Sequence, residues 1–400
     1  MCGIYGKFEF EQSLRVNDAI NALNLLEHRG PDGFGIEYGC YKETKYNIYH
    51  NRIVEDTTQT EANYFLGHRR LSIIDLNDNA FQPMETSTGL SIVFNGEIYN
   101  YIELKEELLA LGCTFATDHS DTEVLLNAYS VWGAGCLEKL RGMFAFAIFD
   151  RPNKKVFIAR DRIGQKTLYY QFSNCGFTFS SELPSILKYS EPCEIDQTGL
   201  NAYMALGYIP HPYTIYSNIK KLPPATYAVI DLNKQDMSLE QYWDLEPIEN
   251  NTRSMAETVK ATQAILAESV KYRLRADVSV GAFISGGTDS TLIVKNISEI
   301  SDQKFDIYGA DFPNTHRSEK KYIVEAANKY SQKLNLSNID SSHIANIESI
   351  IKVIDEPFDG GSSIALFDLF KVASKEHKVI LTGDGGDEMF AGYTRYVTSP

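Results

Sequence analysis

The first half of the chain consists of short apolar runs separated by polar turns. β-Branched and aromatic residues typical of strands fill LSIIDL at 71–76, LSIVFNGEIYNY at 90–101, MFAFAIFD at 143–150, KVFIARD at 155–161 and GFTFSSE at 176–182. Two helices are expected among these runs, at Tyr101 to Leu111 and at Asp121 to Tyr129. The pattern predicts a domain of mixed α and β structure.

The second half has a different pattern. EPIENNTRS at 246–254 is a polar linker, and we place the domain boundary there. A helix from Met255 to about Arg275 then precedes the apolar run VSVGAFI, and apolar runs recur at FDIYGADF and KVILT with helical stretches between them. Buried strands that alternate with helices predict a doubly wound parallel α/β sheet. We expect a first domain at 1–195, a connecting segment at 196–250 and a second domain at 251–400.

Composition narrows the class of protein. The chain is 43% hydrophobic and 23% charged, as in an ordinary globular protein. Its net charge of -15 disfavours a nucleic-acid partner. The six cysteines form no CxxC pair, no stretch approaches about 18 consecutive apolar residues, and acidic residues interrupt the N-terminus. We therefore expect a cytoplasmic protein that does not bind a membrane.

The N-terminal sequence MCGIYGKF raises a chemical possibility. Removal of Met1 leaves Cys2 with a thiol and a free α-amine, whose ordinary pKa values are about 8.5 and about 7.7 to 8.0. An amine that titrates so close to neutrality can take the thiol proton, as in enzymes with an N-terminal nucleophile. The alternative is that Cys2 is simply a small buried residue.

Two loops in the second half have the composition of a nucleotide site. The first, in FISGGTDSTL at 283–292, lies between an apolar strand and a helix, where glycines and a helix N-terminus favour a phosphate. The second, in ILTGDGGDEMFAGY at 380–393, places Asp384, Asp387 and Glu388 after another apolar strand. Together they favour a nucleotide with magnesium. The alternatives are a capped turn and a solvated acidic turn.

These motifs resemble a known family. SGGTDS is similar to the PP-loop of ATP pyrophosphatases, and the acidic loop is similar to that of asparagine synthetases. In the first half, Cys2 with Gly3, HRGPDGFG at 28–35, GHRRLSIIDL at 67–76, NGEIYN at 95–100 and HSDTEVLL at 119–126 occur in the order of a class II glutamine amidotransferase. The chain thus resembles glutamine-hydrolysing asparagine synthetases over essentially all 400 residues. The resemblance implies an αββα sandwich of the N-terminal nucleophile type, followed by the parallel α/β nucleotide-binding domain.

The resemblance also implies roles for individual residues. Cys2 is the expected nucleophile, Asn95 and Gly96 form the oxyanion hole, and Arg70 and Asp121 bind the α-carboxylate and α-ammonium of glutamine. The choice of Arg70 over Arg69 depends on the family motif. Magnesium is assigned to Asp289 and Asp387. The residues expected at ATP are Ile284, Ser285, Gly286, Gly287, Asp289, Ser290, Tyr308, Thr382, Gly383 and Asp384.

The implied reaction uses glutamine, aspartate and ATP: ammonia released at Cys2 reacts with β-aspartyl-AMP to give asparagine. Two alternatives stay open, an amidotransferase for another carboxylate such as a sugar acid, and a catalytically silent glutamine or nucleotide sensor. The sequence does not determine whether the protein is a homodimer. It departs from the family at Ala225, where glycine is usual, and at its end at Pro400, which predicts that a C-terminal helical part is missing.

Overall fold

A computed structural model describes residues 1–43, 45–51, 62–189, 193–246, 252–301, 305–313, 315, 318–330, 332–353, 356–357, 360, 362–394 and 396. The chain divides into two compact units, Met1–Pro247 with Asp355–Asp359, and Ile248–Ile354 with Gly360–Pro400. Most of the expected linker at 246–254 and the chain end at Pro400 lie outside the described residues.

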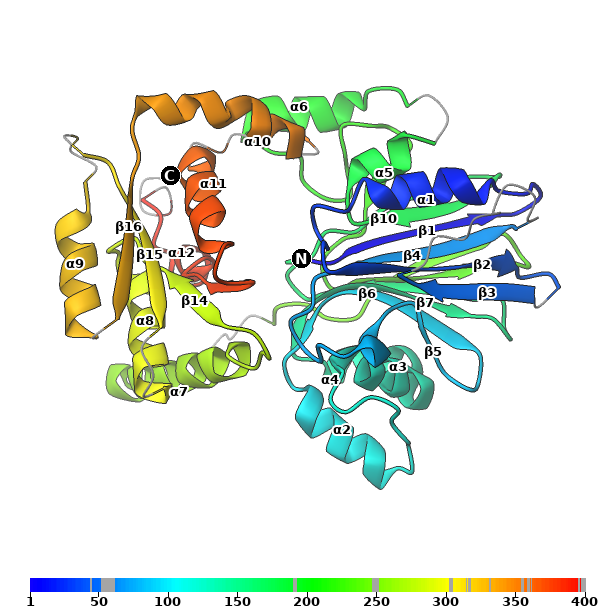
Figure 1. Ribbon diagram of the computed structural model, residues 1–400, viewed down its shortest axis with the longest axis horizontal. Helices are drawn as coiled ribbons and strands as arrows, with labels where there is room; N and C mark the ends of the chain where they lie inside the picture. Colours follow the sequence, from blue (N-terminus) through cyan, green and yellow to red (C-terminus); the bar gives the residue numbers. More distant parts are fainter. Residues whose placement is uncertain are drawn as a thin grey trace. The chain divides into compact units, whose positions relative to one another are not determined.

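The first unit contains two antiparallel sheets (Figure 1). One sheet has the order β11 (Lys220–Lys221), β9 (Tyr169–Phe172), β10 (Gly176–Ser180), β1 (Gly3–Glu9), β4 (Tyr64–Arg70), β2 (Gly33–Cys40) and β3 (Lys45–His50). The other has the order β13 (Asp236–Gln241), β12 (Thr226–Asp231), β8 (Lys155–Arg160), β7 (Gly142–Asp150), β6 (Leu90–Ile98) and β5 (Met84–Glu85).

The two sheets pack face to face. One apolar core contains Phe8 and Phe177 from the first sheet together with Ala147 and Val156 from the second. The outer face of the first sheet packs against α1 (Val16–Asn24), and that of the second packs against α2 (Tyr101–Ala110), α3 (Asp121–Trp132) and α4 (Cys136–Lys139). The expected αββα sandwich is confirmed. Helices α5 (Leu183–Leu187) and α6 (Gln197–Leu206) follow the sandwich strands along the chain.

One expected strand is wrong. LSIIDL at 71–76 is not a strand, because β4 ends at Arg70 and the chain then leaves the sheet. Leu71, Ile73 and Ile74 instead line a pocket. An apolar run of this length predicts burial, but the sequence alone does not distinguish a buried strand from a buried loop. The two expected helices of this region are confirmed as α2 and α3.

The second unit contains a parallel sheet with the order β16 (Lys333–Asn338), β15 (Asp306–Asp311), β14 (Val280–Phe283) and β17 (Val379–Leu381). One face packs against α7 (Met255–Arg273), α8 (Thr288–Ile300) and α9 (Lys320–Lys329). The other face packs against α11 (Ser363–Ala373), and η3 (Ser341–Asn346) and α10 (Ile347–Val353) precede that helix. Helices on both faces confirm the predicted doubly wound sheet.

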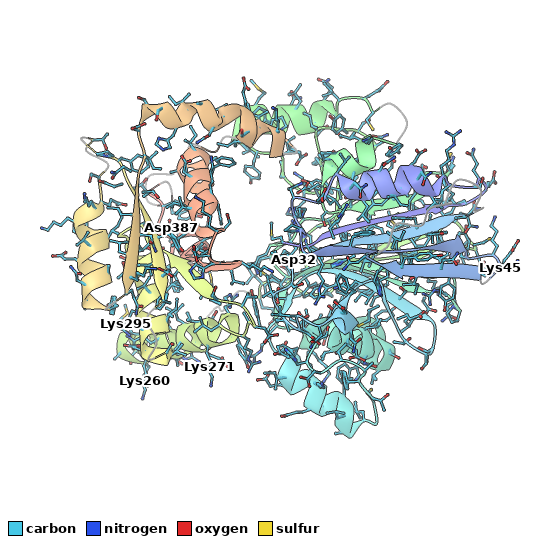
Figure 2. All side chains as sticks on the ribbon, in the orientation of Figure 1. Asp32, Lys45, Lys260, Lys271, Lys295 and Asp387 are labelled. Carbon is cyan, nitrogen blue, oxygen red and sulfur yellow. The ribbon has the colours of Figure 1, made fainter. Side chains whose placement is uncertain are left out.

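Local signals explain where the helices of this unit begin. Ser254 and Glu257 form a capping box at the start of α7. The polar faces of α7 and α8 carry Lys260, Lys271 and Lys295 (Figure 2), and Lys295 pairs with Glu299 one turn later at 2.7 Å. Within the part of the chain that the structure describes, no helix is both long and apolar enough to cross a membrane.

Candidate active site

Cys2 directly precedes β1, the strand that pairs with β4 and β10 in the first sheet. The Leu71 N–H approaches its Sγ at 3.4 Å, and the Leu71 carbonyl lies 3.6 Å from the same sulfur. Arg29 donates from Nε to the Cys2 carbonyl at 3.0 Å, and the Met1 amine donates to the Arg29 carbonyl at 3.2 Å. Burial raises the pKa of the Cys2 thiol. A base beside the thiol is therefore needed to form the thiolate.

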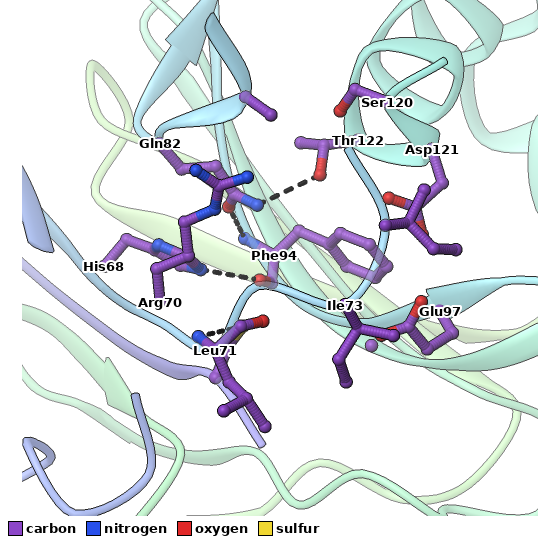
Figure 3. Close-up of a pocket in the computed structure, with 14 residues that line it drawn as sticks. His68, Arg70, Leu71, Ile73, Gln82, Phe94, Glu97, Ser120, Asp121 and Thr122 are labelled. Carbon is purple, nitrogen blue, oxygen red and sulfur yellow. Dashed lines mark hydrogen bonds between the residues drawn. The ribbon is translucent and has the colours of Figure 1, made fainter. Parts of the chain in front are cut away.

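A pocket opens beside Cys2 (Figure 3). Its lining comes from β4 and the loop after it, from β6, and from the N-terminus of α3. The lining residues are Cys2, His68, Arg70, Leu71, Ile73, Ile74, Ala80, Gln82, Phe94, Gly96, Glu97, Ser120, Asp121 and Thr122. Four of the five residues expected at glutamine are therefore in one place, although they are up to 119 positions apart in the sequence, from Cys2 to Asp121.

Arg70 is the last residue of β4 and is buried in the pocket wall. Its Nη1 donates to the Asn77 carbonyl at 3.0 Å, its Nη2 donates to the Asp75 carbonyl, and its guanidinium lies 4.7 Å from the centre of the Phe81 ring. Arg69 points to the opposite face of the strand, where it donates to the Asn24 side chain and is not part of the lining. The structure thus directs Arg70, and not its neighbour, into the pocket.

Asp121 is the first residue of α3 and contributes a buried carboxylate to the opposite wall. Its Oδ2 accepts a hydrogen bond from the Ile98 N–H at 3.0 Å. Desolvation by burial raises the pKa of Asp121 from 3.8 to about 6, although hydrogen bonds from backbone N–H groups act in the other direction. The group is mostly ionised at pH 7 and can attract an ammonium.

The two expected oxyanion residues are consecutive on β6. A Cβ on Gly96 would lie 2.2 Å from the Met143 carbonyl oxygen, so only glycine fits at that position. Asn95 is not part of the pocket lining, but its side-chain amide is buried and neither of its polar atoms has a partner among the described residues. Val93, two residues before Asn95, belongs to the core between the sheets, so the Asn95 side chain points to that same layer. Ile4, two residues after Cys2, also belongs to this core. A buried amide without a partner is costly and is typical of a ligand site.

The polar lining residues that were not predicted include Glu97, His68 and Gln82. Glu97 follows Asn95 and Gly96 directly in NGEIYN, and this motif was the signal that could have indicated it. His68 lies in the same segment as Arg70, and Gln82 comes from the turn before β5. The motif GHRRLSIIDL contains His68 and could have indicated it, whereas no pattern in the sequence distinguishes Gln82 from an ordinary polar residue.

A second candidate site lies in the second unit, after β14. Gly287 precedes α8 as its N-cap and has no side-chain cap, and Gly286 has a φ of 85°, which glycine adopts without strain. Ser290 Oγ lies 3.0 Å from Ser285 Oγ and 3.1 Å from the Ser285 N–H. The loop therefore presents hydroxyls and the N-terminus of a helix of 13 residues, which together suit a phosphate.

The acidic loop after β17 contacts this glycine-rich loop. A Cβ on Gly386 would lie 2.5 Å from Asp289 Oδ2, and one on Gly383 would lie 2.7 Å from the Ser290 N. Thr382 donates to Asp384 at 2.8 Å, and Asp387 lies in α12 (Gly386–Phe390). Within the described ranges, no three His, Cys, Asp or Glu side chains are close enough together to hold a metal ion.

Two of the residues expected at ATP, Ile284 and Tyr308, are deeply buried. Ile284 packs in the core beneath α7, α8 and α9, and its N–H donates to the Tyr308 carbonyl at 2.9 Å. The Tyr308 ring belongs to the core beneath α11. Because both side chains are packed in the core, a nucleotide would contact only their backbone groups at the strand ends.

Comparison with known proteins gives two matching family models, "Glutamine amidotransferase domain" at residues 52–243 and "Asparagine synthase" at residues 261–399. The chain is 34% identical to "Putative asparagine synthetase (glutamine-hydrolyzing) 2" of Methanocaldococcus jannaschii, over 99% of this chain and 76% of that protein. It is also 34% identical to "Asparagine synthetase (glutamine-hydrolyzing) 1" of Bacillus subtilis, over 99% of this chain and 59% of that protein. Among solved structures it resembles the glutamine phosphoribosylpyrophosphate amidotransferase of B. subtilis in complex with ADP and GMP, with a TM-score of 0.44 and 16% identity over 90% of this chain and 72% of that chain.

The chain therefore spans about three quarters of the length of one curated relative and less than two thirds of the other.

Proposed function

This chain belongs to the glutamine-hydrolysing asparagine synthetase family, and from that premise we propose that it releases ammonia from glutamine and uses it to make asparagine from aspartate and ATP. The observation that supports the first step best is the pocket that contains Cys2, Arg70 and Asp121 together. Family membership and the two adjoining loops of the second unit support the second step.

In the proposed glutaminase reaction, glutamine lies across the pocket. Arg70 binds its α-carboxylate and Asp121 binds its α-ammonium. After Met1 is removed, the α-amine of Cys2 takes the thiol proton, and the sulfur attacks the γ-carbonyl carbon. The carbonyl oxygen gains negative charge, which the Gly96 N–H and the Asn95 side-chain amide stabilise. The C–N bond then breaks as the Cys2 α-ammonium returns its proton to the leaving nitrogen, ammonia leaves, and water hydrolyses the thioester to glutamate and restores the thiol.

In the proposed synthetase reaction, ATP transfers its AMP group to the β-carboxylate of aspartate, pyrophosphate leaves, and ammonia displaces AMP to give asparagine. Ser285, Gly287 and Ser290 suit the pyrophosphate, because they offer hydroxyls and backbone N–H groups at the start of α8. Magnesium would neutralise part of the triphosphate charge, and Asp289 and Asp387 are the carboxylates that would bind it. Their loops contact each other, and this contact supports the assignment.

Two other functions remain in competition. A different carboxylate, such as a sugar acid, could replace aspartate, because no described residue identifies the acceptor. A catalytically silent glutamine or nucleotide sensor would use the same pockets without chemistry. The glutaminase residues argue against a sensor, because binding alone needs neither a nucleophile at Cys2 nor the unpartnered amide of Asn95. We also propose a cytoplasmic location, which the six free cysteines support.

The test measures the two reactions separately. Purified protein with glutamine alone should release glutamate and ammonia, whereas a sensor would release none. Protein supplied with ammonia, ATP, magnesium and aspartate should form asparagine, AMP and pyrophosphate in equal amounts. Pyrophosphate release with a sugar acid but not with aspartate would change the acceptor and leave the reaction class unchanged.

A further inference from the structure

Strand β6 has an edge that passes through the pocket. Among the described residues, β5 pairs with β6 only at Ser91 and Ile92, so from Phe94 onward no strand covers this edge. Alternate residues of an antiparallel strand direct their N–H and C=O groups to the same side. Phe94, Gly96 and Ile98 therefore share the open edge, while the intervening residues pair with β7. The Gly96 N–H, an expected oxyanion donor, is one of the groups on this edge.

Side chains take the place of the missing strand. The Phe94 N–H donates to Gln82 Oε1 at 2.6 Å, and His68 Nε2 lies 3.1 Å from the Phe94 carbonyl (Figure 3). The Ile98 N–H donates to Asp121 at 3.0 Å. The backbone groups on both sides of Gly96 along this edge are thus bound by buried side chains from three other segments.

These side chains are well fixed. His68 and Gln82 are 0% and 5% exposed, and Gln82 Nε2 donates to Thr122 Oγ1 at 3.0 Å, beside Asp121. Burial keeps His68 neutral by lowering its pKa to about 3. A carbonyl can only accept, so the proton of the neutral ring is on Nε2. A paired strand in this position would have covered the Gly96 N–H as well, whereas two side chains at Phe94 leave it accessible.

We propose that His68 and Gln82 are positioning residues for glutamine hydrolysis: they fix both polar backbone groups of Phe94, and thereby direct the Gly96 N–H and the Asn95 amide at the oxyanion. The inference rests on the proposed glutaminase function of this pocket. Neither residue needs to touch the reacting atoms. The oxyanion is present in the transition states for formation and for hydrolysis of the thioester, so loss of this positioning lowers kcat whichever step is slower.

The expected magnitude follows from related chemistry. Removal of one oxyanion donor costs about 10²- to 10³-fold in kcat. Misdirection of a donor that is still present should cost less, about 10- to 100-fold. Arg70 and Asp121 bind the other end of glutamine, and the hydrogen bonds given above for them involve Asn77, Asp75 and Ile98 rather than His68 or Gln82, so KM should stay within about threefold. A residue that only stabilises the fold would not separate kcat from KM in this way.

The experiment compares variants that keep or lose the hydrogen bonds to Phe94. His68→Gln can still donate to the Phe94 carbonyl, His68→Asn is too short to reach it, and Gln82→Met removes both bonds made by Gln82. Ser91→Ala is the matched control. Ser91 lies on β6, the same strand as Phe94, but outside the pocket, and the substitution removes its buried hydrogen bond to Glu37. Kinetics of glutamate release are measured for each variant of the full chain, and tryptophan fluorescence reports whether it is folded.

We expect His68→Asn and Gln82→Met to lose about 10- to 100-fold in kcat with little change in KM, and His68→Gln to stay within about fivefold of the original protein. Equal losses in His68→Gln and His68→Asn, or unchanged kcat in Gln82→Met, would overturn the inference. So would a loss in Ser91→Ala as large as that in Gln82→Met. If the unmodified protein releases no glutamate, the proposed function fails, and this inference fails with it.

Discussion

Asp121→Asn is predicted to stabilise the protein while abolishing its glutaminase activity. Asp121 is 6% exposed, and burial raises the pKa of its carboxyl group from 3.8 to about 6. A carboxyl group with a raised pKa in the folded state favours folding when it is protonated and opposes folding when it is ionised. Its contribution to stability is therefore fully present below pH 3.8 and is lost as the pH rises through about 6.

The size of the effect follows from the same two values. One pKa unit corresponds to about 1.4 kcal/mol, so the ionised group costs on the order of 3 kcal/mol at pH 8 and about half of that at pH 5. Asparagine carries no charge, and its side-chain oxygen can still accept from the Ile98 N–H. The variant should therefore gain up to about 3 kcal/mol in the free energy of unfolding at pH 8, and about half as much at pH 5.

Urea unfolding at the two pH values measures this gain. Both tryptophans, Trp132 and Trp243, lie in the first unit, and Trp132 is the last residue of α3, so fluorescence reports on the part of the chain that contains Asp121. Asp118→Asn is the control, because it removes the same charge from a side chain that is 87% exposed. Equal or lower stability of Asp121→Asn at pH 8, or a gain that does not depend on pH, would refute the reasoning.

Four further changes to the chain, three substitutions and one N-terminal tag, lead to separate predictions. Cys2→Ala should abolish glutamate release and leave ATP binding unchanged. Because this variant is inactive, calorimetry can measure its affinity for glutamine. That affinity should fall by up to about tenfold per pH unit below pH 6, because protonated Asp121 no longer attracts the α-ammonium. An uncleaved N-terminal tag should likewise abolish glutamate release, since it converts the α-amine to an amide, and activity in a chain shown by mass spectrometry to retain its tag would contradict the proposed base. Asp289→Asn should weaken ATP binding in the presence of magnesium, measured by titration, without changing glutamate release; equal loss of both would indicate misfolding instead. Ala225→Gly should raise the free energy of unfolding by about 1 kcal/mol, because Ala225 has a φ of 52° that glycine adopts more easily. The urea midpoint should rise accordingly, and an unchanged midpoint would show that Ala225 is not strained.

Local features of the sequence determined most of the architecture. Runs such as MFAFAIFD and KVFIARD are strands because β-branched and aromatic residues favour extended structure, and the strand, glycine-rich loop and helix around Ser285 follow each other directly along the chain. The ordered motifs from Cys2 to Asp121 led to the family, which the comparisons then showed. The departure at Ala225 was also visible in the sequence, although its positive φ was not.

Tertiary structure decided how the active site is assembled. LSIIDL has the composition of a strand, yet it forms a pocket wall because β4 ends at Arg70 and the chain must leave the sheet. His68 and Gln82 acquire a role only where their segments meet the open edge of β6, a meeting that hydrophobic periodicity does not encode. The pKa of Asp121 likewise depends on burial by distant segments. The sequence determines which side chains are available, but long-range packing determines which backbone groups remain unpaired, and unpaired groups are where chemistry can take place.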